Sequence, residues 1–551
     1  MTTPFEISDR LCEDISDLIP VAATFYGIPG RDHLWGDFSP TGQAAVAELS
    51  ARYIAELAPH LDHHEEKQRL AARAITADLQ EKIDRFDAGE HLIELNHIFS
   101  PPQVARDVFD VMDPSDDKTW QAIVTRLDTI SEPLIGYRDC LQAGLDSGQV
   151  VAKRQVESVI QQCRSLASDE SRFLKYVAMA DELNRDVEGT ASAVESARRA
   201  YDSLANWLES DYLPNASEAD AVGRERYLRA TEYFLGIGID LDETYGWGWS
   251  EVHRLRSEME RTAAEIDPDK SIAEVIEMLD TDPERMAPSH EAFAEFVEGI
   301  QAEAVDQLSG EHFDVPTELR KVTVNIAPGD GALGAWYHGP SEDLSRPGSI
   351  WYAPGSRTAI PVWQEVSTAY HEGFPGHHLQ VGIGVMLRDE VSRYHRLFMW
   401  KSGAGEGWAL YAERLMEELG YFANAEYRLG LYASQLFRAT RVVVDIGTQL
   451  GLVIPDDAPL YPGEVWNHDI AVDYMEKVGL QERDVAESEV KRYLGWYGQA
   501  ISYKVGEREI LKMREERMTK DGVDFDVKEF HKDLLRVGAI RLDQVREYVL
   551  A

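Results

Sequence analysis

The sequence predicts a mainly α-helical protein with one small antiparallel sheet. Two observations lead to this fold class. Through most of the 551 residues, apolar side chains recur three and four positions apart with charged residues between them, which is the spacing of one helix face. Between about residues 318 and 353 the apolar residues alternate instead, as they do along a half-buried strand.

The helical periodicity is clearest in the first 270 residues. Breaks that contain proline separate the periodic runs, as expected because proline lacks the N–H group that a helix interior needs. These breaks are Pro101–Pro102, Leu213–Pro214 and Asp267–Asp269. The expected helices are Gln43–Leu61, His64–Phe86, Trp120–Ile130, Val151–Ala167, Thr190–Leu208, Glu218–Leu235 and Ser250–Ile266.

The alternating region predicts three strands, at Leu319–Ile326, Ala335–His338 and Ser349–Ala353, joined by turns rich in Gly, Pro and Asp. The last of these strands could also pair with an extended peptide by strand addition. Helical periodicity resumes near Val362 and continues to the C-terminus. We therefore expect a helical region over residues 1–310 and a second region over 311–551, or one continuous domain that contains both.

Charge and composition exclude several classes of function. The chain has 55 Lys and Arg against 98 Asp and Glu, a net charge of −43, so no broad basic surface is expected for nucleic acid or an anionic membrane. No window approaches the roughly 18 to 20 apolar residues of a membrane helix. The N-terminus lacks a signal pattern, and three widely spaced cysteines predict no disulfide framework. We expect a cytoplasmic protein whose acidic excess solvates its surface, with an acidic cleft for cationic substrates as the alternative.

Histidines concentrate in the segment Thr368–Gln380. Three His and one Glu fall within eight residues, although the whole chain has only 16 His. Imidazole nitrogens are common zinc ligands, and a Glu that follows the first His can accept a proton from a water activated by the metal. This pattern makes His371 a candidate ligand and Glu372 a candidate general base.

The spacing of these histidines is unusual. In the familiar H-E-x-x-H pattern the second His lies four residues after the first, on the same helix face, but here Pro375 occupies that position. On a straight helix, His377 would lie about 120° off the face of His371, and His378 about 10.5 Å further along the axis. Pro375 and Gly376 would permit a local bulge that brings His377 to the usual place of the second ligand. The alternative is a helix break followed by surface histidines.

The next helix offers a third ligand. Within Lys401–Glu413, Glu406 follows a run of small residues that would allow two backbones to approach closely. A carboxylate on such a face needs a partner, because burying it unpaired is costly. A metal ion is one partner, and the structural alternative is an arginine: Arg414, Arg438 or Arg441. Glu413, on the same face, is expected to support a ligand histidine or to serve the structure.

Residues further along the chain could stabilise charge or hold a substrate. Tyr503 and Tyr497 are candidate donors to the oxyanion of peptide hydrolysis, with ordinary packing as the alternative. Asp445 could orient a ligand histidine, or pair with the arginine four residues before it. Three cations are candidates for binding a substrate carboxylate, with ion pairs inside the protein as the alternative: Arg441, Arg492 and Lys504.

These motifs carry a family resemblance. His371–Gln380 (H-E-G-F-P-G-H-H-L-Q), followed by Glu406–Tyr411, resembles a bacterial family of zincin-like proteins of unknown function (domain of unknown function, family 885). Arg441–Gly447 and Gly498–Gly506 match the same pattern, so the resemblance covers roughly residues 320–550. The chain departs from the pattern at two positions, where the family usually has His and Pro: Gln449 and Tyr497.

More distantly, the pattern is similar to gluzincin peptidases, including the carboxypeptidase Taq family. This resemblance implies a gluzincin-like fold of long helices that binds one Zn²⁺ in a cleft, which residues 1–310 would roof. It assigns His371, His377 and Glu406 as the zinc ligands, with His378 as the alternative to His377. It also favours Tyr503 over Tyr497 as the oxyanion donor.

The sequence therefore predicts a zinc-dependent hydrolase of peptide bonds, either a carboxypeptidase or a small oligopeptidase. Its expected substrates are short peptides or acylated amino acids, and no nucleic-acid or membrane partner is expected. Two alternatives remain: a catalytically silent metal- or peptide-binding protein on the same fold, and a metal-dependent amidase that acts on a non-peptide C–N bond.

Overall fold

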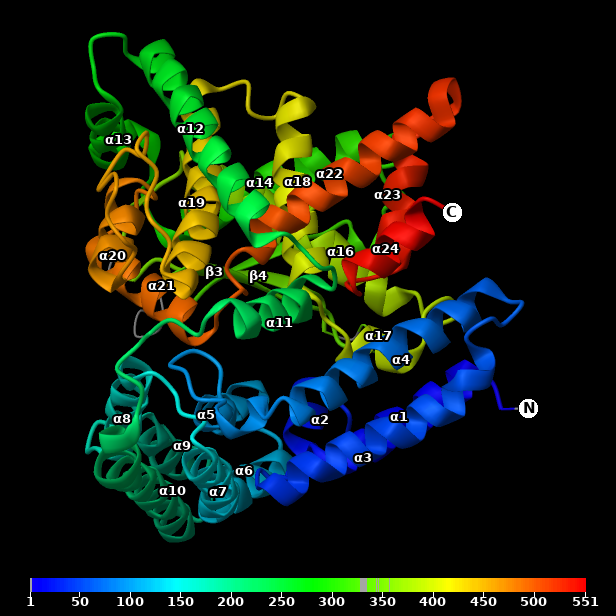
Figure 1. Cartoon of the computed structure of the whole chain (residues 1–551), viewed down its shortest axis with the longest axis vertical. Coiled ribbons are helices and arrows are strands. Elements are labelled where there is room, and N and C mark those ends of the chain that lie inside the picture. Colours follow the sequence, from blue (N-terminus) through cyan, green and yellow to red (C-terminus); the bar gives the residue numbers. More distant parts are fainter. Residues whose placement is uncertain (1, 328–333, 343, 345, 356) are drawn as a thin grey trace. The chain divides into compact units, whose positions relative to one another are not determined.

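A computed structural model describes residues 2–327, 334–342, 344, 346–355 and 357–551 (Figure 1). The chain is mainly helical with small sheets, which confirms the predicted class. It forms two compact units. The first comprises residues up to Val222, Ser392–Phe398 and Lys491–Trp496, and the second comprises Gly223–Val391, Met399–Val490 and Tyr497–Ala551. The expected division at residue 310, with the first part roofing a cleft, stays a prediction.

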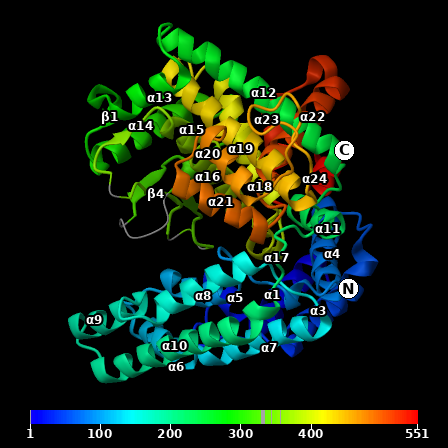
Figure 2. The same ribbon diagram turned by 60° about the vertical axis from the view of Figure 1, so that its left-hand side comes forward.

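The first unit is built from helices, several of which pack around α10 (Figure 2). Along α10 the residues Ala193, Ala197, Tyr201 and Leu204 recur at helical spacing, and all four are buried against neighbouring helices. The helices are α1 (Pro4–Leu18), α2 (Pro20–Phe25), α3 (Pro40–Leu57), α4 (Glu66–Asp87), α5 (Pro101–Asp107), α6 (Asp117–Thr129), α7 (Ser131–Ser147), α8 (Lys153–Ala167), α9 (Lys175–Glu182), α10 (Val187–Trp207) and α17 (Arg393–Phe398).

The second unit contains the longest helices and the strands. Its helices are α11 (Arg224–Leu235), α12 (Leu241–Ile266), α13 (Ile272–Thr281), α14 (His290–Leu308), α15 (Glu365–Glu372), α16 (His377–Met386), α18 (Ser402–Glu418), α19 (Ala425–Leu450), α20 (His468–Lys477), α22 (Ser502–Asp521), α23 (Val527–Arg536) and α24 (Leu542–Val549). Helix α21 (Arg483–Gly495) begins here and ends in the first unit. Within the described residues, no helix is long and apolar enough to cross a membrane.

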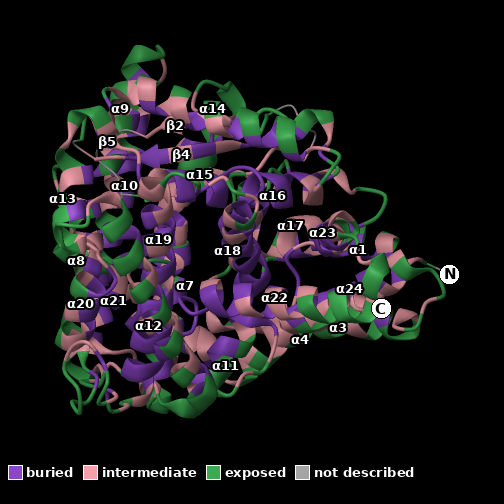
Figure 3. Cartoon of the chain, turned by 90° about the horizontal axis from the view of Figure 1, so that it is seen from above, coloured by how far each residue is buried: buried purple, intermediate pink, exposed green. Residues whose placement is uncertain are grey.

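Helix α19 forms the centre of the second unit. The side chain of Asn424 accepts the backbone N–H of Glu426 at its start, and Gly451, with a φ of 60°, ends it in the left-handed conformation. Helix α12 packs along α19, and α18 packs against α22 (Figure 1). Most residues of α18 and α19 are buried (Figure 3). Functional side chains on these helices are therefore held in a packed interior.

The predicted small sheet is present, with strands β2 (Thr323–Ile326), β3 (Gly334–His338) and β4 (Ser349–Ala353) in the order β2-β4-β3. Strand β3 pairs with β4 in antiparallel register, so Trp336 stacks on Trp351, but β2 runs parallel to β4. The three-stranded sheet is thus mixed. A second pair, β1 (Met286–Ala287) with β5 (Ile360–Pro361), is antiparallel. Because β4 has a strand on each side, the suggestion that it accepts a peptide by strand addition is wrong.

Glycines allow α18 and α22 to touch through their backbones. A Cβ atom added at Gly407 would lie 2.5 Å from the backbone carbon of Gly506, and one added at Gly506 would lie 2.1 Å from the carbonyl oxygen of Gly403. The run of small residues before Glu406 thus serves close helix packing, as expected. This contact fixes the start of α22 next to the helix that carries Glu406 and Glu413.

A pair of Gly→Ala variants tests this packing. Gly407→Ala should lower the free energy of unfolding by about 1 to 3 kcal/mol, because neither backbone can move away without strain. Gly246→Ala, in α12, has no atom within 4 Å of the new methyl group and should raise it by about 0.5 to 1 kcal/mol, as helix propensity predicts. Urea unfolding measures both. Equal effects of the two substitutions would contradict the close contact.

Candidate metal centre

The histidine segment consists of two helices separated by a turn. Helix α15 ends at Glu372, and α16 begins at His377. The N–H of Gly376 donates to the carbonyl of Tyr370 at 3.1 Å and so closes the turn between them. The expected local bulge is therefore wrong in kind, because the helix ends and restarts. The histidines after the break are nevertheless buried, His377 being 8% and His378 1% exposed, so they are not surface residues.

Three residues define the shape of this turn. Gly376 is required, because a Cβ atom there would lie 2.0 Å from the carbonyl oxygen of His371. The indole N–H of Trp408 donates to the carbonyl of Pro375 at 2.9 Å. Gln301 in α14 accepts the N–H of Phe374 at 2.5 Å and donates to the carbonyl of Ala369, in α15, at 2.9 Å.

Sequence reasoning missed Gln301. It is 1% exposed and lies on the buried face of α14, in step with Phe293 and Val297 at spacings of four. A lone glutamine at an apolar position of a helix face needs hydrogen-bond partners when it is buried. That signal could have identified Gln301 as a residue that holds a backbone segment.

The turn brings His371 and His377 together with Glu406 of α18. Oxygen Oε2 of Glu406 lies 3.5 Å from Nε2 of His371 and 3.3 Å from Nε2 of His377. One donor atom from each of the three residues lies within 4.8 Å of the other two. The imidazole rings face the shared space at an angle of 86°, with their centres 4.9 Å apart. The structure thus assembles the three residues that the sequence predicted as ligands.

Two of the three distances between these atoms match those around a tetrahedral cation. Ligand atoms that lie about 2.0 to 2.1 Å from a zinc ion are separated by about 3.3 Å from one another in a tetrahedron, close to both distances to Glu406. Among the described residues, the carboxylate of Glu406 contacts these histidines and no arginine. Among the described residues, Glu406 therefore does not form the arginine ion pair that the sequence offered as the alternative.

Glu413 orients His371 from behind. Its Oε1 lies 2.8 Å from Nδ1 of His371, and its Oε2 accepts the hydroxyl of Ser367 at 2.6 Å. An Nδ1–H that donates to Glu413 leaves the lone pair of Nε2 directed at the shared space. Burial lowers the pKa of His371, but the hydrogen bonds to Glu406 and Glu413 outweigh it and raise that pKa to about 9. The site therefore favours a positive charge.

His378 is directed elsewhere. Its Nε2 lies 2.9 Å from the carbonyl oxygen of Leu319, and its Nδ1 lies 3.1 Å from the hydroxyl of Tyr337. Burial lowers its pKa. Both nitrogens of His378 thus make structural hydrogen bonds from α16 to Leu319 and Tyr337. His377, and not His378, therefore belongs with the candidate ligands.

Glu372 and Tyr503 lie beside the cluster. Glu372 directly follows His371, and its carboxylate makes no hydrogen bond within the described part of the chain. The ring of Tyr503 lies nearly parallel to that of His371, with their centres 6.3 Å apart. Tyr497 lies before the turn at Gly498 that leads into α22. The predicted base and one predicted oxyanion donor therefore flank the candidate ligands.

Asp445 and Arg441 contact the start of α22, where Tyr503 lies, and the turn before it. Asp445 is fully buried, and its Oδ2 accepts the N–H of Gly498, whose φ is +79°. Arg441 pairs with Glu489 at 2.9 Å and lies over the ring of Tyr503, 4.8 Å from its centre. The carboxylate in contact with a candidate ligand histidine is thus Glu413, and Asp445 binds the turn before α22.

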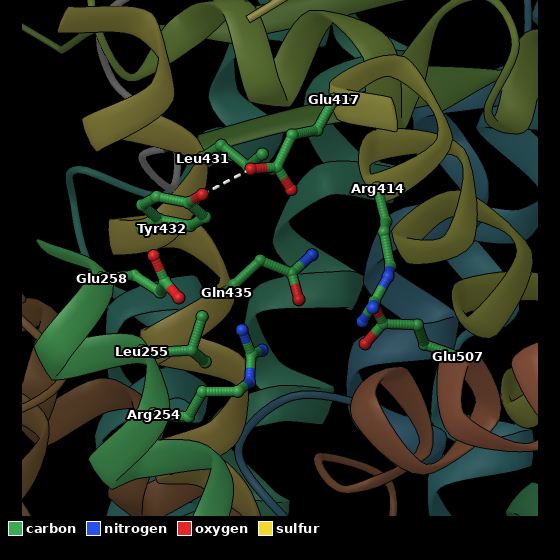
Figure 4. A pocket seen from close by; sticks show the side chains of 9 residues that line it. All are labelled: Arg254, Leu255, Glu258, Arg414, Glu417, Leu431, Tyr432, Gln435 and Glu507. Carbon is green, nitrogen blue, oxygen red and sulfur yellow. Dashed lines mark hydrogen bonds between the residues drawn. The ribbon is translucent and has the colours of Figure 1, made fainter. Parts of the chain in front are cut away.

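The other two predicted cations are Lys504 and Arg492. Lys504 is 1% exposed, and its Nζ contacts Glu507 and Gln435, each at 2.5 Å. Gln435 and Glu507 line a polar pocket of about 230 Å³, formed by α12, α18, α19 and α22 (Figure 4). The charge of Lys504 is thus neutralised within the protein. Arg492 belongs to the first unit.

Comparison with known proteins shows the family and the fold. The sequence model of one family, described as bacterial protein of unknown function (DUF885), matches residues 20–549. No curated protein matches the chain. Solved structures of other proteins are also similar to this chain. One, from Colwellia psychrerythraea, is described as a "putative lipoprotein"; it has a TM-score of 0.85 and 20% identity, over 100% of this chain and 99% of that one.

The second similar structure is from Shewanella oneidensis and is described as a "putative lipoprotein of unknown function". It has a TM-score of 0.77 and 18% identity, and the match covers both chains completely. At these identities the likeness shows the fold alone. The kinship with gluzincin peptidases is not among these findings and stays a prediction.

Two neighbouring substitutions test which histidine binds metal. His377→Ala should abolish stoichiometric zinc binding, because it removes one of three ligands. His378→Ala should keep zinc and lower the melting temperature, because it breaks two buried structural hydrogen bonds. Zinc content after reconstitution and dialysis, with thermal unfolding of the metal-free proteins, measures both. Loss of zinc in His378→Ala with retention in His377→Ala would contradict the grouping.

Proposed function

The chain belongs to the DUF885 family, and we propose that it is a zinc-dependent hydrolase of peptide bonds, either a carboxypeptidase or a small oligopeptidase. One observation carries the proposal: a buried His-His-Glu cluster has a carboxylate behind one histidine and another carboxylate directly beside it. That combination is the set of groups that metal-assisted hydrolysis needs.

His371, His377 and Glu406 would hold the ion. Three protein ligands leave one tetrahedral position open, as in catalytic rather than structural zinc sites. Zinc bound there would supply Lewis-acid polarisation of a carbonyl group and activation of a water molecule. Glu413 would keep the ring of His371 in the tautomer that presents Nε2.

Glu372 would act as the general base. It accepts a proton from the attacking water and passes it to the leaving amine, so one carboxylate serves both proton transfers. Its carboxylate is suited to this role because no described residue holds it in a hydrogen bond. Tyr503, stacked beside His371, would donate its hydroxyl to the developing oxyanion.

The proposed substrates are short peptides or acylated amino acids, and the proposed location is the cytoplasm. The strongly acidic composition argues against nucleic acid and anionic membrane surfaces as partners. The two structures compared above are each described as a "putative lipoprotein". The alternative location is therefore a membrane surface, to which a lipid would attach the protein.

A catalytically silent metal- or peptide-binding protein is the second candidate. One observation favours it: Gln449, where the family pattern usually has histidine, is fully buried near the end of α19. A metal-dependent amidase would use the same residues on a non-peptide C–N bond. A panel of dipeptides, acyl-amino acids and simple amides separates these functions, because a binder raises its melting temperature without releasing amine.

Glu372→Gln tests the proposed base. The variant should bind zinc as the wild type does, because residue 372 is not a candidate ligand, and should lose hydrolysis by roughly 10² to 10⁴-fold. Glu417→Gln is the matched control on α18, where the carboxylate contacts Tyr432, and should keep full activity. Zinc content and the rate of amine release measure the outcome.

Retained hydrolysis in Glu372→Gln would remove the assignment of the base. Absence of stoichiometric zinc in the reconstituted wild-type protein would remove the proposed function itself. Zinc binding without amine release from any member of the panel would leave the silent binder as the function.

A further inference from the structure

One cation near the candidate metal centre makes no hydrogen bond or ion pair with the described residues. Arg438 lies on α19, and its guanidinium carbon is 4.9 Å from the ring centre of Phe437 and 6.0 Å from that of Tyr503. Its side chain makes no hydrogen bond or ion pair with any described residue, and its Nε is buried without a partner. The sequence suggested Arg438 only as a possible ion-pair partner of Glu406.

The surrounding charges make this isolation unusual. Arg441, one turn later, also lies over Tyr503, but its charge is balanced by Glu489 at 2.9 Å. The nearby carboxylate of Glu413 is occupied by His371 and Ser367. Arg441 therefore has a carboxylate within ion-pair distance, whereas Arg438 makes no ion pair with a described residue. Burial lowers the pKa of Arg438 and the neighbouring Arg441 lowers it further, while the negative charges of Glu413 and Glu489 only partly offset both effects.

Such an arrangement is costly without an anion. A partly desolvated guanidinium next to another cation loses hydration and gains repulsion, and a hydrogen-bonded carboxylate relieves both. Arginine suits this role, because its planar group can donate two parallel hydrogen bonds to one carboxylate. An anion that lies between Arg438 and the metal cluster would supply such a carboxylate.

Two distances to the ring of Tyr503 limit how far Arg438 can be from the cluster. Its ring lies 6.0 Å from the guanidinium carbon of Arg438 and 6.3 Å from the ring centre of His371. The distance from the guanidinium carbon of Arg438 to the ring centre of His371 is therefore at most the sum of these two distances. An extended peptide advances at most about 3.3 to 3.6 Å per residue, so one or two residues and a hydrogen bond span this gap.

We propose that Arg438 binds the C-terminal carboxylate of a short peptide substrate, whose scissile bond lies one or two residues before that carboxylate at the His371–His377–Glu406 cluster. This proposal rests on the proposed hydrolase function and narrows it to cleavage near a free C-terminus.

Matched pairs of substrates test the proposal. The zinc-loaded full chain is assayed on N-acetyl dipeptides that end in alanine, phenylalanine or lysine, each as the free acid and as the C-terminal amide. The wild type should cleave the acids with a kcat/KM roughly 10 to 100-fold higher than the amides, as expected for one charge-assisted pair. Arg438→Met should lose this preference mainly through a higher KM for the acids, with the amides unchanged, and Arg438→Lys should recover part of it.

Arg428→Met is the matched control. It removes one arginine from the same helix, where Arg428 contacts the carbonyl of Phe422 and pairs with Glu265. This variant should keep the ratio of acid to amide cleavage. Thermal unfolding of each variant checks that the fold is retained, and the ratio within one variant does not depend on the fraction of active protein.

The outcomes separate this proposal from the proposed function. Equal cleavage of acids and amides by the wild type, or an unchanged preference in Arg438→Met, would overturn the role of Arg438 and leave a zinc hydrolase. If no substrate is cleaved, the hydrolase fails, and calorimetry with N-acetylphenylalanine and its amide then tests Arg438 alone. Tighter binding of the acid that disappears in Arg438→Met supports the carboxylate site, and equal binding of both probes overturns it.

Discussion

The break between α15 and α16 positions the candidate metal centre. Two histidines six residues apart would point about 120° away from each other on an unbroken helix, and here the turn at Gly373–Gly376 brings their rings to within 4.9 Å between centres. The turn depends on contacts from two other helices, Gln301 of α14 and Trp408 of α18. Because Trp408 and Glu406 share α18, the helix that secures the turn also brings the third candidate ligand.

Charges around this centre are arranged in two groups. Glu372, Glu406 and Glu413 lie around the two histidines, where they favour a cation. Arg438 and Arg441 both lie within 6.0 Å of the ring centre of Tyr503, and Glu489 pairs with Arg441. A substrate with a polarised carbonyl group at one end and a carboxylate at the other would match both groups. The proposed chemistry therefore depends on the local balance of these few groups and not on the net charge of −43.

Much of this could be predicted from the sequence, because it depends on local patterns. Periodicity located the long helices and the three strands. The residue types identified His371 and Glu406 as candidate ligands, and the family resemblance selected His377 over His378. The rest depends on contacts between distant residues. Gln301 reaches Phe374 across 73 positions, and the parallel pairing of β2 with β4 follows from which strand lies in the middle. In the sequence Arg438 looked like an ordinary structural arginine. Only the fold shows that Arg441 forms an ion pair with Glu489 and that Arg438 forms no ion pair with a described residue.

The central claim is that His371, His377 and Glu406 bind one zinc ion together. A crystal structure of the zinc-reconstituted protein, with anomalous scattering recorded on both sides of the zinc absorption edge, tests it most directly. We predict one strong anomalous peak about 2.0 to 2.2 Å from Nε2 of His371, Nε2 of His377 and a carboxylate oxygen of Glu406, with Glu413 bound to Nδ1 of His371. A peak on His378 or at another site, or no zinc peak at this cluster, would contradict the account.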